Sequence, residues 1–336
     1  MLPFFRKHWF LLLVLLGTVI VAACPDWLGW TDHLNLTVCG AAAVFFSAWT
    51  LETRSLGKAL ARPWPAMWAA VISYVLLPCL GIAGGWLLPG PPDYRIGLLI
   101  VTSVPCTLVS AVIWTRMANG DDATALLITF ITNCTSWLAT TAWLTLAAGT
   151  GGPAPRAARL MLQLIVVLVI PVGVGQSLRV PPILRRMATE HRIPLSVAAR
   201  LLTLAVMLKA AVEVRIQFGE GQPAPPLTTL IIAAITCLVI HLIALATGWW
   251  SSRALGIDRS RCIAVAFGGS QKTLPVSLIL FDAYFRDYPL AVIPIVFYHF
   301  GQLIVDTFIA ERMAIRSTRW HKEHKRASEE SAGLLP

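Results

Sequence analysis

Charged residues are scarce in this chain, making up 13% of its 336 residues. A soluble domain carries about 25% charged residues, so this deficit excludes a soluble core with a solvated surface. Hydrophobic residues account for 57% of the chain, and its mean hydropathy is +0.71. The strict alternation of a membrane β-barrel is absent. We therefore predict an all-α polytopic membrane protein.

Motifs for catalysis and for metal binding are missing as well. The chain contains no HExxH, no clustered Ser, His and Asp, and no phosphate-binding glycine loop. Its seven cysteines form no CxxC pair and have no metal-ligand spacing. We therefore expect neither an enzyme nor a bound cofactor. The net charge of +10 sits mainly in short connections and the C-terminal tail, so we expect the lipid bilayer, and no nucleic acid, as a partner.

Apolar segments recur along the chain, separated by joints rich in Pro and Gly such as "PGPPDY" and "EGQPAPP". We predict that residues 1–314 form one transmembrane domain and that the polar residues 315–336 form a disordered tail. Lys and Arg gather in the joints that share a side with both termini, which places the termini in the cytoplasm, at a plasma or inner membrane. The expected spans, about ten in number, run over about residues 9–24, 36–51, 66–88, 96–118, 123–149, 158–178, 195–214, 227–250, 261–284 and 289–313.

The ten expected spans divide into two halves of five, residues 1–150 and 151–314. Because five is odd, the halves enter the membrane in opposite orientations, which predicts an inverted repeat. The fourth span of each half contains a proline and small polar residues, in "TSVPCTLVS" and "AFGGSQKTLPVS". A proline removes a backbone donor, and backbone groups freed in lipid need partners. We predict two broken helices that together form a polar transport site, with ordinary proline kinks as the alternative.

Lys272 lies inside the second of these interrupted spans. An unpaired lysine at the centre of a membrane helix costs about 2.5 to 3.5 kcal/mol, so it needs a partner or a polar pocket. Three roles are open to it: a built-in cation that replaces a sodium ion, a proton-coupling site, and a counter-ion for an anionic substrate. A lysine that extends to the membrane surface is the alternative.

Other ionisable residues lie in the last spans. His299, Gln302 and Asp306 are spaced by three and four residues, so they share one helical face. Ionisable residues within a membrane are functional candidates. For His299, a purely structural role in a helix–helix contact is an equal alternative. Asp306 is a candidate partner for Lys272. For His241 we expect a structural hydrogen bond.

Several stretches carry a resemblance to a known family. "VPCTLVSAVIWTRMANGDDATALLITFITNC" resembles the bile acid:sodium symporter superfamily, and "FGGSQKTLP" followed by "IPIVFYHFGQLIVDTFIAERMA" is similar to its SBF-like branch. The resemblance covers about residues 5–315. It implies a ten-helix transporter of two inverted five-helix repeats, in which the two broken helices cross. It also implies a core domain of spans three to five and eight to ten, a panel domain of the other four, and sodium-coupled uptake of organic anions.

The resemblance also implies site residues. Pro105 marks the first break, and Ser110 occupies the place of a hydroxyl ligand for sodium. Thr129 and Asn133 fall where the fifth span supplies ligands, so a sodium ion, the one metal expected, would lie near these residues and Ser110. Our candidate substrate and ion site is completed by Ser73, Thr132, Gly269, Ser270, Gln271, Lys272, Thr273, His299, Gln302 and Asp306.

The chain departs from the family at one position of the second break. Sodium symporters carry a carboxylate two residues before a glycine that aligns with Gly269; here that position is Phe267. We therefore expect a secondary active transporter of a small organic anion or related solute, with alternating access and with sodium coupling in question. A proton is the other candidate coupling ion. A membrane regulatory or accessory protein on the same scaffold, without transport, is the alternative, and the substrate and oligomeric state stay open.

Overall fold

A computed structural model describes residues 12–332, except residues 14–15, 18, 22, 53–55, 149–155 and 220–224. Every regular element in this part of the chain is a helix, which confirms the all-α prediction. The described residues also contain seven helical stretches that are long and apolar enough to cross a membrane. They are Trp64–Leu87, Asp122–Leu146, Ala157–Ser177, Arg192–Val212, Leu227–Ala254, Arg259–Tyr284 and Pro289–Ile315.

The described residues contain the following helices, given in chain order. The first half contains η1 (Pro25–His33), α2 (Leu36–Thr50), α3 (Leu56–Leu60), α4 (Trp64–Val71), η3 (Ile72–Leu76), α5 (Leu77–Leu87), α6 (Asp93–Ser103), α7 (Ser110–Met117) and α8 (Asp122–Ala148). The second half contains α9 (Ala157–Leu164), η4 (Ile165–Val169), α10 (Ile170–Ser177), α11 (Pro182–Glu190), α12 (Arg192–Gly219), α13 (Leu227–Ala254), α14 (Arg259–Ser270), α15 (Leu274–Tyr284), η5 (Pro289–Ala291) and α16 (Val292–Ala332).

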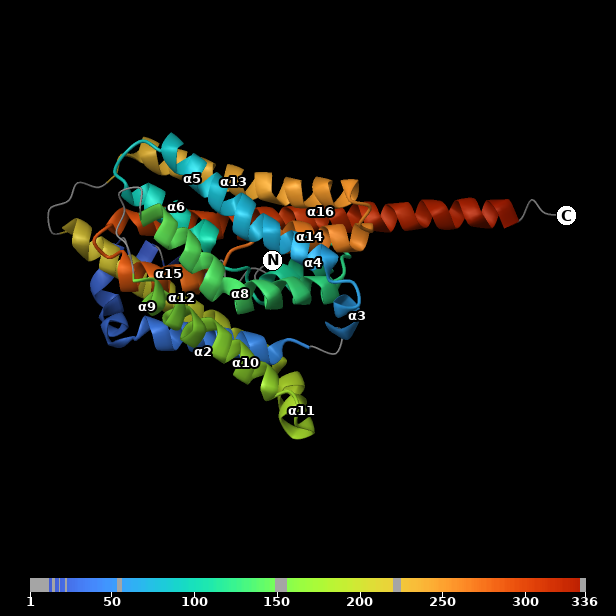
Figure 1. Ribbon diagram of the computed structural model, residues 1–336, viewed down its shortest axis with the longest axis horizontal. Helices are drawn as coiled ribbons and strands as arrows, with labels where there is room; N and C mark the ends of the chain where they lie inside the picture. Colours follow the sequence, from blue (N-terminus) through green and yellow to red (C-terminus); the bar gives the residue numbers. More distant parts are fainter. Residues whose placement is uncertain are drawn as a thin grey trace.

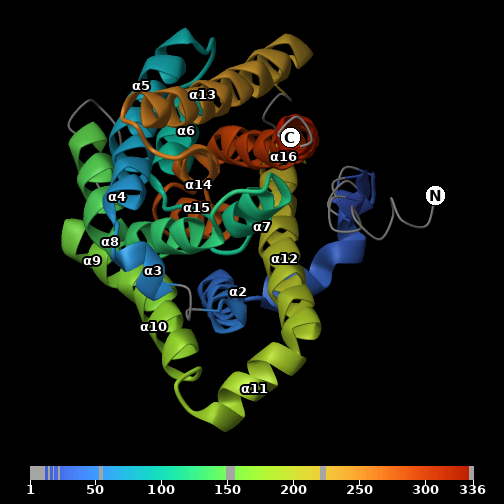
Figure 2. The same ribbon diagram turned by 90° about the vertical axis from the view of Figure 1, so that its right-hand side faces the viewer.

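The helices form two groups that pack side by side. The crossing group contains α4 to α8 and α13 to α16, and the flanking group contains α2, α9, α10 and α12, with α11 joining α10 to α12 (Figures 1 and 2). Within the flanking group, α2 packs against both α10 and α12. Helices α14 and α15 are the most enclosed: 94% of the most apolar stretch of Arg259–Tyr284 is buried, against 33% for Ala157–Ser177.

The first interruption in the crossing group separates α6 from α7. α6 ends at Ser103, and Val104 adopts an extended conformation with φ −70° and ψ 163°. Because Val104 precedes Pro105, the proline ring disfavours a helical conformation at Val104. The chain becomes helical again at Ser110, the first residue of α7.

The second interruption separates α14 from α15. α14 ends at Ser270, and both Gln271 and Thr273 have extended backbones. α15 then begins with a proline in its first turn, Pro275. Proline fits there because its missing N–H would have no helical partner at that position. The chain is thus interrupted at the two places where the sequence led us to expect it.

The count of ten spans is not reached among the described residues. The expected span 9–24 lies partly outside them, and the span 36–51 corresponds to α2, an apolar helix of 15 residues. The span 96–118 is divided into α6 and α7. A helix needs about 20 residues to cross a bilayer, so neither piece counts alone. The ten-helix count and the inverted repeat therefore stay predictions.

The C-terminal segment differs from our expectation. The sequence predicts a disordered tail over residues 315–336, but α16 continues as a helix to Ala332 and projects beyond the other helices (Figure 1). The segment up to Ala332 contains neither Gly nor Pro and is rich in Arg, Lys, Glu and Ala. These residues have high intrinsic helix propensity, and that local preference explains the difference.

Close packing of α6 against the start of α16 yields a prediction. A Cβ added at Gly97 would overlap the carbonyl oxygen of Ala291 and lie 2.6 Å from Cγ of Pro294. We expect Gly97→Ala to lower the free energy of unfolding by about 1 to 3 kcal/mol, because overpacking forces backbone shifts. Thermal unfolding in detergent measures the effect.

The matched control is Gly173→Ala in α10, where an added Cβ meets nothing within 4 Å. That substitution should leave the unfolding temperature unchanged or raise it slightly, since Ala has the higher helix propensity. Equal unfolding temperatures for the Gly97 variant and the wild type would contradict the contact between α6 and η5.

Candidate functional site

Lys272 lies at the centre of the second interruption, with 1% of its surface exposed. Its Nζ donates hydrogen bonds to the carbonyl oxygen of Ser73 at 2.7 Å, to Oγ of Ser73 at 2.9 Å and to the carbonyl oxygen of Val104 at 2.7 Å. The ring of Tyr74 lies below Nζ, 5.3 Å from its centroid. An ammonium has three donors and no acceptor, so three oxygen partners match its protonated form.

Local backbone geometry explains why these oxygens are available. Ser73 lies in the π-helical turn η3, where the N–H of Leu77 bonds to the carbonyl of Ile72, five residues back. In that register the partner of the Ser73 carbonyl would be the nitrogen of Pro78, which has no hydrogen. Val104 has left the helix because it precedes Pro105. Two prolines thus supply the carbonyl oxygens that hold the ammonium.

The two interruptions touch each other directly. The backbone N–H of Thr273 donates to the carbonyl of Pro105 at 3.1 Å. Beside it, Oγ1 of Thr107 donates to Oε1 of Gln271 at 2.7 Å and accepts from the N–H of Ala111 in α7 at 3.2 Å. Side chains and backbone groups therefore connect the α6–α7 link with the α14–α15 link.

Gln302 fixes the backbone of Lys272 and the tautomer of a histidine. Its Oε1 accepts from the Lys272 N–H at 2.9 Å, and its Nε2 donates to the Lys272 carbonyl at 2.8 Å. Because a backbone N–H only donates and a carbonyl only accepts, the amide has one orientation. Its second Nε2 proton points to Nδ1 of His299, 2.9 Å away. Nδ1 of His299 is therefore an acceptor, and the ring carries its proton on Nε2.

Asp306 is fully buried and does not pair with Lys272, which corrects our expectation for this residue. Its Oδ1 lies 2.8 Å from Nε2 of His241, and its Oδ2 accepts from Nε2 of Gln271 at 2.6 Å. The hydrogen bonds of Lys272 go instead to Ser73 and Val104. Asp306 on α16 is satisfied by α13 and by Gln271 of the α14–α15 link, whereas the ammonium of Lys272 bonds to η3 and to the α6–α7 link.

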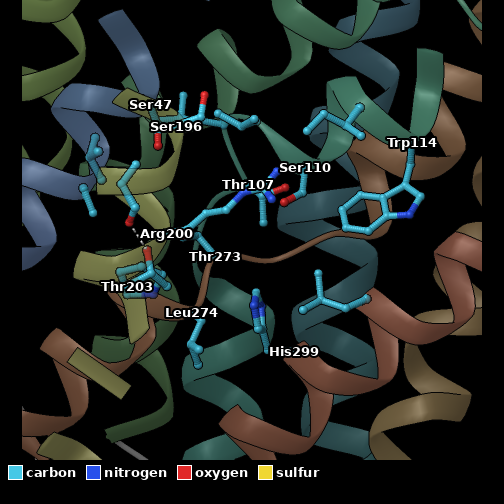
Figure 3. Close-up of a pocket in the computed structure, with 18 of the residues that line it drawn as sticks. Ser47, Thr107, Ser110, Trp114, Ser196, Arg200, Thr203, Thr273, Leu274 and His299 are labelled. Carbon is cyan, nitrogen blue, oxygen red and sulfur yellow. Dashed lines mark hydrogen bonds between the residues drawn. The ribbon is translucent and has the colours of Figure 1, made fainter. Parts of the chain in front are cut away.

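A cavity of about 280 Å³ lies between the crossing group and the flanking group. Its walls come from α2 and α12 on one side and from the α6–α7 link, α7, α8, α15 and α16 on the other. Figure 3 shows Ser196 and Arg200 of α12 on one side, and Thr107, Ser110 and His299 on the other. Among the described residues that line the cavity, only Arg200 has a permanently charged side chain. The polar lining consists of Ser47, Thr107, Ser110, Asn133, Ser196, Arg200, Thr203, Thr273, His299 and Thr307.

The residues expected from the sequence fall into three places. Some line the cavity: Ser110, Asn133, Thr273 and His299. Others lie behind it, in and around the crossing: Ser73, Pro105, Ser270, Gln271, Lys272, Gln302 and Asp306. Three remain inside the helix packing: Oγ1 of Thr129 and Thr132 bonds to the carbonyls of its own helix, and Gly269 packs against Ile72.

The expected sodium ligands do not form an open oxygen cluster. The amide nitrogen of Asn133, rather than its oxygen, faces the carbonyls of Cys106 at 3.0 Å and Thr129 at 2.8 Å. Ser110 lines the cavity, whereas Oγ1 of Thr129 donates to the carbonyl of Leu126 in its own helix. The oxygens that do converge in this region converge on Nζ of Lys272.

Sequence reasoning missed several residues of the site. Thr107 and Arg200 line the cavity, and Tyr298 donates its hydroxyl to the Ser270 carbonyl at 2.8 Å. The signal for Arg200 was present, because it is a charged residue inside the expected apolar span 195–214. Thr107 and Tyr298 had no such signal, since their roles depend on which segments meet.

Comparison with known proteins relates the chain to a family of transporters. The model of the SBF-like CPA transporter family matches residues 8–315. The chain is 27% identical over 294 residues to "Probable sodium/metabolite cotransporter BASS4, chloroplastic" of Arabidopsis thaliana, covering 83% of this chain and 66% of that protein. It is 27% identical over 328 residues to the protein of the same name from Oryza sativa subsp. japonica, covering 91% and 75%. It is also 21% identical over 349 residues to sodium/bile acid cotransporter 7-B of Xenopus laevis, covering 94% and 97%.

The role of Gln302 leads to a prediction about stability. Gln302→Leu leaves the N–H and carbonyl of Lys272 without these partners in a buried site. A buried unsatisfied polar group costs about 1 to 3 kcal/mol, so we expect a clear drop in the unfolding temperature in detergent.

Gln163→Leu is the matched control, because Gln163 lies on α9 in the flanking group and is partly exposed. We expect it to unfold at the wild-type temperature. A Gln302 variant as stable as this control would show that the amide does not hold the α14–α15 link.

Proposed function

Because the chain belongs to the SBF-like CPA transporter family, we propose that it is a secondary active transporter of a small organic anion or a related solute. The substrate binds in the cavity between the crossing group and the flanking group. Movement of one group against the other then exposes the cavity to the two sides of the membrane in turn. We place the protein in a plasma or inner membrane with both termini in the cytoplasm, following the distribution of Lys and Arg.

The observation that carries the anionic substrate is the set of positive groups around the cavity. Ser110 begins α7, Leu274 begins α15, and both residues line the cavity. Helix N-termini carry partial positive charge and unpaired N–H groups, so both favour an anion. Arg200 adds a full positive charge from α12, and Nε2 of His299 adds a neutral donor. No acidic side chain lines the cavity among the described residues.

We further propose that Lys272 is a built-in cation that replaces a coupling sodium ion. Two backbone carbonyls and one hydroxyl surround its Nζ at 2.7 to 2.9 Å. Oxygen ligands of this kind are those that hard cations prefer in proteins. The relatives named above carry sodium in their names, whereas this chain has Phe267 where the resemblance expects a carboxylate. A fixed ammonium makes the bound sodium unnecessary at this position.

We also propose that the two halves of the chain form an inverted repeat, as the resemblance implies. Ten spans in two inverted repeats would relate the α6–α7 break to the α14–α15 break by a two-fold axis in the membrane plane. The crossing group would then be the core domain and the flanking group the panel domain. Direct contact between the two interruptions, through Thr273 and Pro105, supports this relation.

Arg200→Gln tests the anionic substrate. The full-length protein in detergent is titrated with benzoate, octanoate and benzenesulfonate, and with the neutral benzamide, while thermal unfolding is followed. We expect at least one anion to raise the unfolding temperature of the wild type. We expect the Arg200 variant to bind that anion about 10 to 100 times more weakly, because a hydrogen bond to a charged group is worth about 1.5 to 3 kcal/mol.

Arg186→Gln on α11 is the control, since Arg186 is exposed and pairs with Glu190 outside the cavity. It should bind like the wild type. Equal stabilisation of the wild type by benzamide and by the anions would contradict an anion site. No response to any solute would favour a regulatory or accessory protein on a transporter scaffold, since a transporter must bind its cargo.

A further inference from the structure

His241 and Asp306 form a pair of ionisable side chains that the transport mechanism above does not use. Both are 0% exposed, and they join α13 to α16 through Nε2 and Oδ1 at 2.8 Å. Nδ1 of His241 faces the carbonyl of Ser270, the last residue of α14, at 3.4 Å. That carbonyl also accepts the hydroxyl of Tyr298 at 2.8 Å, and a proton on Nδ1 would be donated to it as well.

This geometry offers the pair a place for one exchangeable proton. With Nδ1 protonated, the short contact between Nε2 and Oδ1 needs a proton of its own. That proton belongs either to an imidazolium facing a carboxylate or to a carboxylic acid facing a neutral imidazole. Both forms have zero net charge. Without the proton, the pair carries one negative charge in a site closed to water.

The pair is connected to the cavity by a chain of hydrogen bonds. Gln271 donates to Oδ2 of Asp306 at 2.6 Å and accepts from Thr107 at 2.7 Å. Thr107 lines the cavity and bonds to the N–H of Ala111 near the start of α7. A solute bound at this end of α7 therefore acts on the pair through two side chains.

In the part of the chain that the structure describes, the partners of the Asp306 carboxylate are His241 and Gln271, and neither is a Lys or an Arg. The titratable side chains around it are Tyr298 and His299 on α16, Cys237 on α13, Cys106 in the α6–α7 link and Lys272 in the α14–α15 link. The next charged residues on the same helices are Arg253 on α13 and Glu311 on α16, and on α14 they are Arg259 and Arg261 at its start. In the crossing group, the other buried carboxylate among the described residues is Asp93, at the first residue of α6.

We propose that the His241–Asp306 pair is the proton-binding site that couples anion transport to proton transport. The proposal rests on the proposed function and follows from a charge count of Lys272 and the pair. With the proton and the substrate anion both bound, the charges of Lys272, the pair and the anion sum to zero. With both absent, the positive charge of Lys272 balances the negative charge of the pair.

The two mismatched states carry a net charge. An anion bound without the proton leaves the crossing group negative, and a proton bound without the anion leaves it positive. Moving an uncompensated charge into a closed, dry site costs several kcal/mol. The crossing group therefore moves either with one proton and one anion or empty, and transport is electroneutral.

The test uses the full-length protein in liposomes loaded with a fluorescent pH indicator and given an inward gradient of benzenesulfonate. This anion stays ionised, so it cannot carry protons through the lipid itself. We expect uptake of benzenesulfonate with acidification of the interior, one proton for each anion, and no effect of a potassium diffusion potential on the rate. Uptake without acidification would overturn the proposal.

His241→Gln and Asp306→Asn identify the site. Each is expected to lose the acidification and to slow benzenesulfonate uptake, because the anion then moves without its proton. The remaining uptake should become faster under an inside-positive potential, because the cycle then moves net negative charge inward. His191→Gln, at the exposed junction of α11 and α12, should retain coupled, potential-independent uptake. Acidification that persists in both variants would exclude the pair.

Absence of wild-type uptake would count against the proposed organic anion transport. In that case a second experiment, which needs no substrate, tests whether the His241–Asp306 pair binds a proton. Infrared difference spectra of the protein in detergent compare acidic with alkaline buffer. The wild type should show bands of an imidazole or carboxyl group that changes its protonation. The loss of these bands in His241→Gln and Asp306→Asn would support the proton site. Identical difference spectra for all three proteins would overturn it.

Discussion

The contact between the two helix interruptions depends on how the ammonium group of Lys272 is held inside the membrane. Nζ of Lys272 has three oxygen partners, two of which are backbone carbonyls freed by proline-containing turns. These hydrogen bonds connect η3 and the α6–α7 link to the α14–α15 link. A lysine without them would carry a large desolvation cost, and carbonyls without the lysine would be unsatisfied in a closed site. The charge and the broken helices therefore stabilise each other.

The same two interruptions place helix C-termini, with partial negative charge, apart from helix N-termini, with partial positive charge. The carbonyl of Val104, just past the end of α6, points to Lys272, and the Ser270 carbonyl at the end of α14 receives the hydroxyl of Tyr298. The opposite ends, at the start of α7 and α15, line the cavity together with Arg200. The two broken helices thus bring carbonyl ends to Lys272 and N-terminal ends to the cavity, and these ends carry opposite partial charges. Our proposals of an anionic substrate in the cavity and of a fixed ammonium behind it both rest on this single feature.

Much of the fold could be predicted from the sequence, because hydropathy and proline positions act locally. The apolar spans, the interruptions near Pro105 and Lys272 and the buried position of Lys272 all follow from short stretches of sequence. The pairing of side chains could not be predicted in this way. Asp306 and Lys272 have opposite charge and lie in neighbouring spans, yet Gln271 and His241 take the carboxylate. The acceptor role of Ser73 depends on a π-helical turn, which no periodicity in the sequence indicates. In the tail, composition and helix propensity point in different directions: the composition predicts disorder, and α16 runs as a helix to Ala332.

The most direct test of this account is the effect of sodium on a protein that has lost the ammonium. Thermal unfolding of the wild type, Lys272→Ala and Lys209→Ala is measured in sodium and in potassium at equal ionic strength. Lys209 is the matched control, since it is also buried and donates to the carbonyls of Thr31 and Asp32, in η1. We expect the wild type and Lys209→Ala to unfold at the same temperature in both salts, and Lys272→Ala to be stabilised selectively by sodium, which occupies the vacated oxygens. Sodium-dependent stability of the wild type itself, or none in Lys272→Ala, would contradict the claim that Lys272 takes the place of a sodium ion.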